Sequence, residues 1–473
     1  MDREHISVLT CQKWNVIVST CRTWNVGPEE QPVNARPAWL DGHLAPVPDE
    51  IDAVGLAVTG TLPPELTGRF FRNGPNPVAG RDSGHWFTGP GMIHGIRLRD
   101  GRAEWYRNRW VKTAALAGAP FVRPDFSVDL TAVPANTHVV PHGDKIYALV
   151  EAGLPYEVTP ELETVGPCDF GGRLTTAMTA HPKQDPVTGE LLFFGYGFLP
   201  PYLTYHRLSA DGELVESREI AVPGPTMMHD FAITEHHVVW LDLPVVFDLD
   251  LAVHGNGMPF RWDDGYGARI GVMPRAGGDV QWFDVDPCYV FHVGNAHERD
   301  GRIVLDCARY EPAAFADIWA MLGGTSDPAR HVGGAGGATL HRWTFDPATG
   351  KATDEALDDR SIEFPTHDDA RTGREHRYLY TVGGAVDRTG APGSIVKYDL
   401  ATGGAIAVAA QTPGEAVFVP APGARAEDEG WLLALVGGTE LAVLDATDLR
   451  QVASVALPRR VPAGFHGNWI PDA

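Results

Sequence analysis

After residue 36, short apolar runs alternate regularly with turn residues along the whole chain. The apolar runs are about 4–8 residues long and rich in β-branched and aromatic residues, which is typical of strands. Many of the bends carry Asp-Gly, Thr-Gly or Ala-Gly, and tight hairpin turns favour such residues because they tolerate positive φ. We therefore predict a series of β-hairpins, with examples in "HGIRLRDGRAEWYRN", "DPVTGELLFFGYG" and "ERDGRIVLDCARY".

Few segments have the pattern of a helix. The best candidate is "EPAAFADIWAMLGG", which covers Glu311–Gly324. A long series of hairpins without β–α–β alternation favours an all-β propeller or a large sandwich. Propeller blades commonly take about 40–50 residues, so roughly six to eight blades would fit this length. We predict a β-propeller, although no WD or kelch signature fixes the number of blades.

Composition narrows the possible partners. The 473 residues carry a formal net charge of -23 that is spread along the chain. Nucleic-acid binding depends on clusters of Lys and Arg, so no nucleic-acid partner is expected. No run of 18 apolar residues predicts a membrane-spanning helix. The five cysteines form no C-x-x-C pair, which favours reduced thiols and a cytoplasmic location.

The first 36 residues lack the alternation of apolar runs and turn residues that marks the rest of the chain. They lack the order of a signal peptide and contain two similar units, "CQKWNV" and "CRTWNV". Two thiols without further Cys or His are too few for a metal site. We expect residues 1–36 to be a poorly ordered leader and residues 37–473 to form one propeller domain.

Four of the 19 histidines stand in crowded, turn-like contexts far apart in the sequence. In a propeller such residues can still meet, because the inner strands of different blades converge on the central axis. His297 is a rival for one of these positions. It lies five residues after the third of the four, so on a regular strand only one of the two can face the axis. The four are His181 in "TAHPK", His229 in "MMHDFAIT", His292 in "FHVGNAHE" and His466 in "FHGNW".

These four blocks belong to a longer ordered set that covers about residues 37–473. Together with "RFFRNGPNP", "WFTGPGMIHG", "EFPTHD" and "GEAVFVP", they resemble the carotenoid cleavage oxygenase family. The resemblance implies a seven-bladed β-propeller, with a few helices and long loops forming a cap over the axial metal site. It also implies one Fe(2+) per chain, held by His181, His229, His292 and His466. Imidazole ligands suit iron, and four of them leave coordination positions open.

The resemblance also assigns residues around this set. Glu151, Glu363 and Glu415 would accept the second N–H of ligating imidazoles, as carboxylates often do. Thr137 would crowd one open position on the iron with its methyl group. Two positions depart from the family pattern. Pro90 replaces a frequent Asp in "TGPGM", and His297 replaces an expected aromatic residue.

The implied activity is that of an Fe(II)-dependent dioxygenase, which uses O₂ to cleave a conjugated C=C bond of a carotenoid or apocarotenoid into two carbonyl products. The substrate would be lipophilic and lie in an apolar tunnel. Tyr196–Tyr205 and Val111–Val122 could line this tunnel, form a lid or provide a peripheral membrane contact. One alternative is a stilbene-cleaving, lignostilbene-type dioxygenase, but those relatives have a lysine where this chain has Val150. A non-catalytic, metal-stabilised binding propeller is the more remote alternative.

The tail "GFHGNWIPDA" gains a role in this interpretation. If His466 is a ligand, the end of the chain must be held at the axis. We expect Gly464 and Gly467 to provide backbone freedom and Trp469 to pack in a closing strand.

Overall fold

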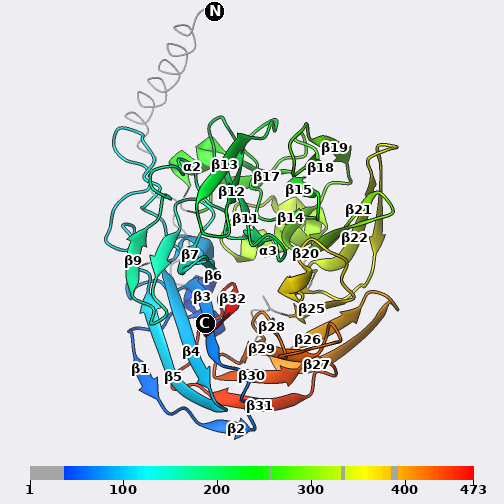
Figure 1. Ribbon diagram of the computed structural model, residues 1–473. Coiled ribbons are helices and arrows are strands. Elements are labelled where there is room, and N and C mark those ends of the chain that lie inside the picture. Colours follow the sequence, from blue (N-terminus) through cyan, green and yellow to red (C-terminus); the bar gives the residue numbers. More distant parts are fainter. Residues whose placement is uncertain (1–36, 82, 256, 332–335, 385–391, 473) are drawn as a thin grey trace, which may run out of the picture. The chain divides into compact units, whose positions relative to one another are not determined.

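Antiparallel sheets surround a central axis in the computed structural model (Figure 1). The structure describes residues 37–473 except 82, 256, 332–335, 385–391 and 473, so the predicted leader lies outside the described residues. Ala38–Ala473 form one compact unit. In the part described, seven sheets form the blades, and the predicted seven-bladed β-propeller is confirmed.

The strands of each blade are given from the innermost strand outward. The first and last strands of the described chain both belong to blade 1. Blade 1 consists of β32 (Gly467–Pro471), β3 (Gly68–Pro75), β4 (Gly91–Arg99), β5 (Arg102–Trp110) and β1 (Asp52–Val54). Blade 2 consists of β6 (His138–His142), β7 (Lys145–Leu149), β8 (Tyr156–Val158) and β9 (Thr164–Pro167). Blade 3 consists of β10 (Lys183–Gln184), β11 (Leu191–Tyr196), β12 (Leu203–Leu208) and β13 (Leu214–Glu219).

The next two blades continue in sequence order. Blade 4 consists of β14 (Phe231–Ile233), β15 (His237–Asp242), β18 (Arg269–Pro274) and β19 (Gln281–Asp284), with a separate ribbon of β16 (Val245–Phe247) and β17 (Phe260–Trp262). Blade 5 consists of β20 (Tyr289–Arg299), β21 (Arg302–Tyr310), β22 (Thr339–Asp346) and β23 (Lys351–Ala356).

The last two blades complete the ring. Blade 6 consists of β24 (Glu363–Thr366), β25 (Tyr378–Gly383), β26 (Pro392–Asp399) and β27 (Gly404–Gln411). Blade 7 consists of β28 (Val417–Pro420), β29 (Gly430–Val436), β30 (Glu440–Asp445), β31 (Gln451–Ala456) and β2 (Val58–Gly60).

Two of the Asp-Gly bends have the predicted backbone conformation at both residues. Asp100 and Gly101 have φ of 49° and 69°, and Asp300 and Gly301 have φ of 50° and 74°. Two consecutive residues with positive φ define the turn that matches the twist of a hairpin. These turns join β4 to β5 and β20 to β21, so the sequence pattern identified these hairpins correctly.

Helices are few in the part of the chain described. The predicted helix at Glu311–Gly324 is observed as α3 (Pro312–Met321), with Glu311 as its N-cap, and it buries Phe315 and Trp319. A second helix, α2 (Leu249–His254), follows β16. Neither is long and apolar enough to cross a membrane. Short 3₁₀ turns lie at η1 (Ala38–Leu40), η2 (Gly42–Leu44), η3 (Trp86–Thr88), η4 (Pro328–Arg330) and η5 (Asp369–Arg371).

Both ends of the described chain close the ring. The second strand, β2, pairs with β31 at the outer edge of blade 7, and the last strand, β32, is the innermost strand of blade 1. A Cβ on Gly464 would lie 2.7 Å from the Asn73 carbonyl oxygen. Gly464 is therefore needed for this close approach, and its φ is not in the left-handed region. Trp469 packs against a buried cluster, as expected for a closing strand.

Three arginines of blade 1 hold the last part of β32 in place. Asp472 accepts from Arg69 at 2.9 Å, forms a bidentate pair with Arg97 and contacts Arg99 at 3.4 Å. The Arg97 side chain is only 2% exposed. Hydrogen bonding to Arg97, against some desolvation, lowers the pKa of Asp472 to about 2.

We predict that Asp472→Asn lowers the free energy of unfolding by about 1–3 kcal/mol, because it leaves a buried guanidinium without its main partner. In the wild type this contribution should persist down to about pH 4 and be lost as the pH falls toward about 2, because the folded carboxyl has the lower pKa. Urea unfolding measures both effects. Asp448→Asn is the control, because its ion pair with Arg450 is exposed and should change stability by less than about 0.5 kcal/mol. An equal decrease in the free energy of unfolding for the two variants would contradict this role of Asp472.

Candidate metal centre

Each of the seven blades places one imidazole or carboxylate at the start of its inner strand. His138 opens β6, His292 lies near the start of β20 and Glu363 opens β24. The other four lie one or two residues before their strands. The full set, in blade order, is His466, His138, His181, His229, His292, Glu363 and Glu415. The axial positions of the propeller are therefore filled by metal-ligating residue types.

The four histidines predicted from the sequence form one buried cluster. Ring centroids are 4.6 Å apart for His181 and His229, and 5.3 Å for His181 and His292. His466 lies 4.7 Å from His181 and 4.8 Å from His292. Ring nitrogens of His181, His292 and His466 all lie within 4.8 Å of one another. Residues from four blades thus converge as the sequence motifs predicted.

Three of these imidazoles contact the three predicted carboxylates through their Nδ1 atoms. The Nδ1 of His229 contacts Glu151. The Nδ1 of His292 lies 2.5 Å from Glu363 Oε2, and the Nδ1 of His466 lies 2.8 Å from Glu415 Oε1. His181 forms no such bond to a carboxylate among the described residues. Its backbone N–H donates to Thr179 Oγ1 at 3.1 Å.

The carboxylates are themselves held in position. Phe364 N–H donates to Glu363 at 2.8 Å, and Gly467 N–H donates to Glu415 at 2.7 Å. Tyr196 OH donates to Glu151 Oε2 at 2.8 Å. The sequence analysis offered Tyr196 as part of a segment that could line the tunnel, form a lid or contact a membrane, and its bond to Glu151 had no signal in the local pattern.

The orientation of these rings suits a cation. A neutral imidazole that donates from Nδ1 has a lone pair on Nε2. His229 Nε2 therefore presents a lone pair to His181 Nε2, which is 3.1 Å away. A metal ion among these nitrogens would be coordinated by this lone pair and by that of His181 in the matching tautomer. The donor set of four imidazoles also fits iron.

The protonation states of the site favour metal binding. Burial, together with the positive charge that neighbouring imidazoles would carry if protonated, lowers the pKa of His181 and His466 well below the usual value. Burial alone would raise the pKa of Glu363, but the charge and hydrogen bond of His292 outweigh it and lower that pKa. Burial alone would lower the pKa of His292, but the charge and hydrogen bond of Glu363 outweigh it and raise that pKa. Low pKa values keep His181 and His466 neutral, as metal ligation requires, whereas His292 and Glu363 form a charge-stabilised pair.

Thr137 and His138 lie beside the histidine cluster, whereas His297 does not. Thr137 donates its hydroxyl to Asn136 Oδ1 at 3.0 Å and lines the adjoining apolar space. His138, a fifth axial histidine, lies 5.0 Å from His466 between ring centroids, and the sequence analysis did not identify it. His297 lies away from the cluster, where its ring is 6.0 Å from that of His376. The preference for His292 over His297 agrees with this geometry.

Two cavities meet the histidine cluster. The first, which we call the apolar cavity, has a volume of about 140 Å³ and is lined mainly by aromatic and aliphatic side chains. Ile318 of α3 and Leu322, which follows this helix, both line the cavity. The end of α3 therefore covers it, as expected for the predicted cap. Of the two segments proposed as tunnel walls, only Tyr196 lines it, whereas none of Val111–Val122 does. Its other lining residues include Trp86, Phe87, Met258, Phe291 and Phe465.

The second cavity, which we call the polar cavity, has a volume of about 410 Å³. His292 and His466 line both cavities, whereas His181 lines only the polar one and His229 only the apolar one. The histidine cluster therefore separates two spaces of different character.

The fold and this site define a seven-bladed β-propeller with a histidine-rich centre beside an apolar cavity. Residues 44–471 match the family model described as retinal pigment epithelial membrane protein. The chain belongs to this family, the carotenoid cleavage oxygenases, and is a dioxygenase of that family.

Individual relatives extend over nearly the whole chain. A "Carotenoid cleavage oxygenase" of Mycobacterium tuberculosis is 42% identical, covering 93% of this chain and 99% of the relative. The crystal structure of Pseudomonas brassicacearum lignostilbene dioxygenase is 30% identical with a TM-score of 0.81, covering 94% of this chain and 100% of that one. Cobalt-substituted Synechocystis apocarotenoid oxygenase is 29% identical with a TM-score of 0.76, covering 90% and 97%.

We predict that His466→Gln and a chain ending at Phe465 both lose metal. The first should lower metal affinity at least about tenfold, because it removes one imidazole but keeps β32. The truncated chain also loses the closing strand. Metal analysis after dialysis against a weak chelator measures the effect. His138→Gln is the matched control and should keep its metal, because His138 is axial but outside the proposed ligand set. Metal retained by His466→Gln but lost from His138→Gln would contradict the proposed ligand set.

Proposed function

We propose that the protein holds one ferrous ion per chain through His181, His229, His292 and His466, and cleaves a conjugated C=C bond of a carotenoid or apocarotenoid into two carbonyl products with O₂. The observation that carries this proposal is the convergence of four imidazoles beside an apolar cavity, three of them backed by carboxylates. When bound, the ferrous ion supplies the chemistry that makes O₂ reactive toward the double bond.

The side chains of the protein position the reactants. Glu151, Glu363 and Glu415 fix three imidazole rings, so that the ring nitrogens point to one place. The aromatic wall excludes water and holds a planar polyene by packing. The Thr137 methyl group narrows the space beside the cluster, and this supports its proposed role in limiting access to one coordination position.

The lining of the apolar cavity favours a polyene over a phenol. Among the described residues, no Lys or Arg lines this cavity, and Val150 occupies the position before Glu151. A phenolate in this space would lack a cationic partner, which is costly in an apolar environment. Thr88 and Ala152 are exposed at the edge of the cavity, where the rest of a long substrate can continue outward.

The stilbene-cleaving alternative retains one specific support, the similarity to the lignostilbene dioxygenase structure. The proposed preference can be tested with an apocarotenal and a hydroxystilbene as competing substrates. We expect aldehyde products and O₂ uptake mainly from the apocarotenal.

Val150→Lys should lower kcat/KM for the apocarotenal about tenfold, because an ammonium group enters the apolar cavity, and should improve cleavage of the hydroxystilbene. Val150→Ile keeps the apolar character and serves as the control. Chromatography of the aldehydes together with an oxygen electrode measures both reactions. A wild-type preference for the hydroxystilbene would contradict the proposed substrate class.

We also propose a cytoplasmic protein that collects its substrate by peripheral membrane contact. Leu199, Leu249 and Val253 are 62%, 40% and 41% exposed. Phe198 and Phe247 stack with ring centroids 5.2 Å apart, which brings the Leu199 loop beside the start of α2. The same loop follows Tyr196 of the apolar cavity. An exposed apolar surface beside the cavity suits a lipophilic substrate.

Sedimentation with phospholipid vesicles tests this contact. Leu199→Glu combined with Leu249→Glu should reduce the bound fraction several-fold, whereas the same change at exposed Val187, in the turn between β10 and β11, should have little effect. Unchanged binding by the double variant would contradict the membrane contact.

A further inference from the structure

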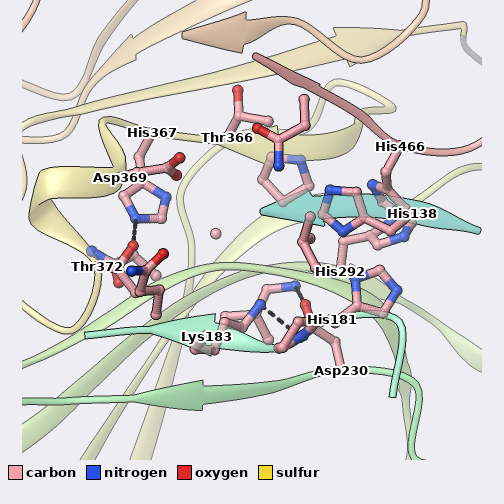
Figure 2. Close-up of a pocket in the computed structure, with 18 of the residues that line it drawn as sticks. His138, His181, Lys183, Asp230, His292, Thr366, His367, Asp369, Thr372 and His466 are labelled. Atoms are coloured by element: carbon pink, nitrogen blue, oxygen red, sulfur yellow. Dashed lines mark hydrogen bonds and ion pairs between the residues drawn. The ribbon is translucent and has the colours of Figure 1, made fainter. Parts of the chain in front are cut away.

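The polar cavity follows the inner strands of the propeller. Its walls include residues of β6, β10, β14, β20, β24 and β32. At one end it reaches the histidine cluster, and its lining also includes the exposed residues Gln184, Pro186 and Ala370. In Figure 2, His367 and Asp369 lie across the cavity from the rings of His181 and His466. The cavity thus connects the surface with the centre independently of the apolar cavity.

Its charged residues favour cations. The lining contains three carboxylates, Asp230, Asp369 and Glu415, and a single ammonium group, that of Lys183. Lys183 is paired with Asp230 at 2.8 Å. Glu415 is engaged by His466 and Gly467. The excess negative charge in a narrow space raises the local concentration of cations.

Asp369 is the carboxylate with no assigned role. It lines the cavity, and its carboxylate forms no hydrogen bond or ion pair with any residue that the structure describes, whereas its backbone carbonyl accepts from Thr372 N–H. Although Asp369 is exposed toward the cavity, desolvation by the surrounding protein, together with the negative charges of Asp368 and Glu415, raises its pKa to about 6. At neutral pH it is therefore mostly ionised, and a passing cation would stabilise it.

The apolar cavity is a poor path for a hydrated metal ion. Its two carboxylates, Glu151 and Glu363, are both engaged, and the rest of its wall is mainly aromatic and aliphatic. Moving a divalent ion past such a wall requires loss of its water shell without replacement, which is very unfavourable. A volume of 410 Å³ corresponds to about a dozen waters at roughly 30 Å³ each, so the polar cavity can hold an ion with its hydration.

We propose that the polar cavity is the uptake route for the divalent metal, and that Asp369 is the carboxylate that draws the hydrated ion toward the histidine cluster. This inference rests on the proposed metal site. It implies that metal can reach the centre while substrate occupies the apolar cavity, because the two cavities share only His292, Phe364 and His466 among their lining residues.

The test is the rate at which metal-free full-length protein takes up Co²⁺, followed by its absorbance. Asp369→Asn should slow uptake about threefold to tenfold, and Ala370→Lys, which adds a positive charge to the cavity lining, should slow it further. Both variants should still reach one Co²⁺ per chain. Asp359→Asn removes the same charge from an exposed position outside the cavity and should load at the wild-type rate.

A second measurement separates the two cavities. An apolar ligand such as an apocarotenal, added before Co²⁺, should leave the uptake rate unchanged. Equal rates for Asp369→Asn and Asp359→Asn, or uptake blocked by the apolar ligand, would overturn the proposed route while leaving the metal site intact. A wild-type protein that takes up no Co²⁺ would instead contradict the metal site itself, and the route with it.

Discussion

The hydrogen bonds from three imidazole Nδ1–H groups to three buried carboxylates are the interactions on which this structure depends. They orient His229, His292 and His466 so that the opposite nitrogens face the axis. Each bond joins different blades, because the histidine and its carboxylate come from separate sheets. The same contacts therefore define the site and link blades 1 and 7, 2 and 4, and 5 and 6.

The structure also depends on closure of the propeller by its last strand. β32 is the last strand of the chain, yet it occupies the inner position of blade 1 and follows His466 directly. The Gly464 approach to Asn73 and the arginines around Asp472 hold this segment on both sides of the strand. Folding of the C-terminus and assembly of the metal centre are thus one event.

The sequence predicted what depends on local chemistry and on ordered motifs. Asp300-Gly301 identified a hairpin, and the blocks around His181 and His466 identified the cluster. It did not identify His138, because an axial position is recognisable only once all inner strands are in register. Val111–Val122 was offered as a tunnel wall, a lid or a membrane contact, and as a wall it is wrong, because none of its residues lines the apolar cavity. Asp369 had no signal in the sequence, because its significance comes from the cavity that it lines and from the absence of a partner for its carboxylate among the described residues.

The most direct test of the account is X-ray absorption at the iron edge of protein loaded anaerobically with Fe²⁺. Four imidazole ligands predict a first shell of nitrogen or oxygen scatterers at about 2.0–2.2 Å, no sulfur, and outer-shell scattering from about four imidazole rings. The same spectrum from the His466→Gln variant should show one imidazole fewer. A sulfur ligand, or an unchanged imidazole count in that variant, would contradict the central claim.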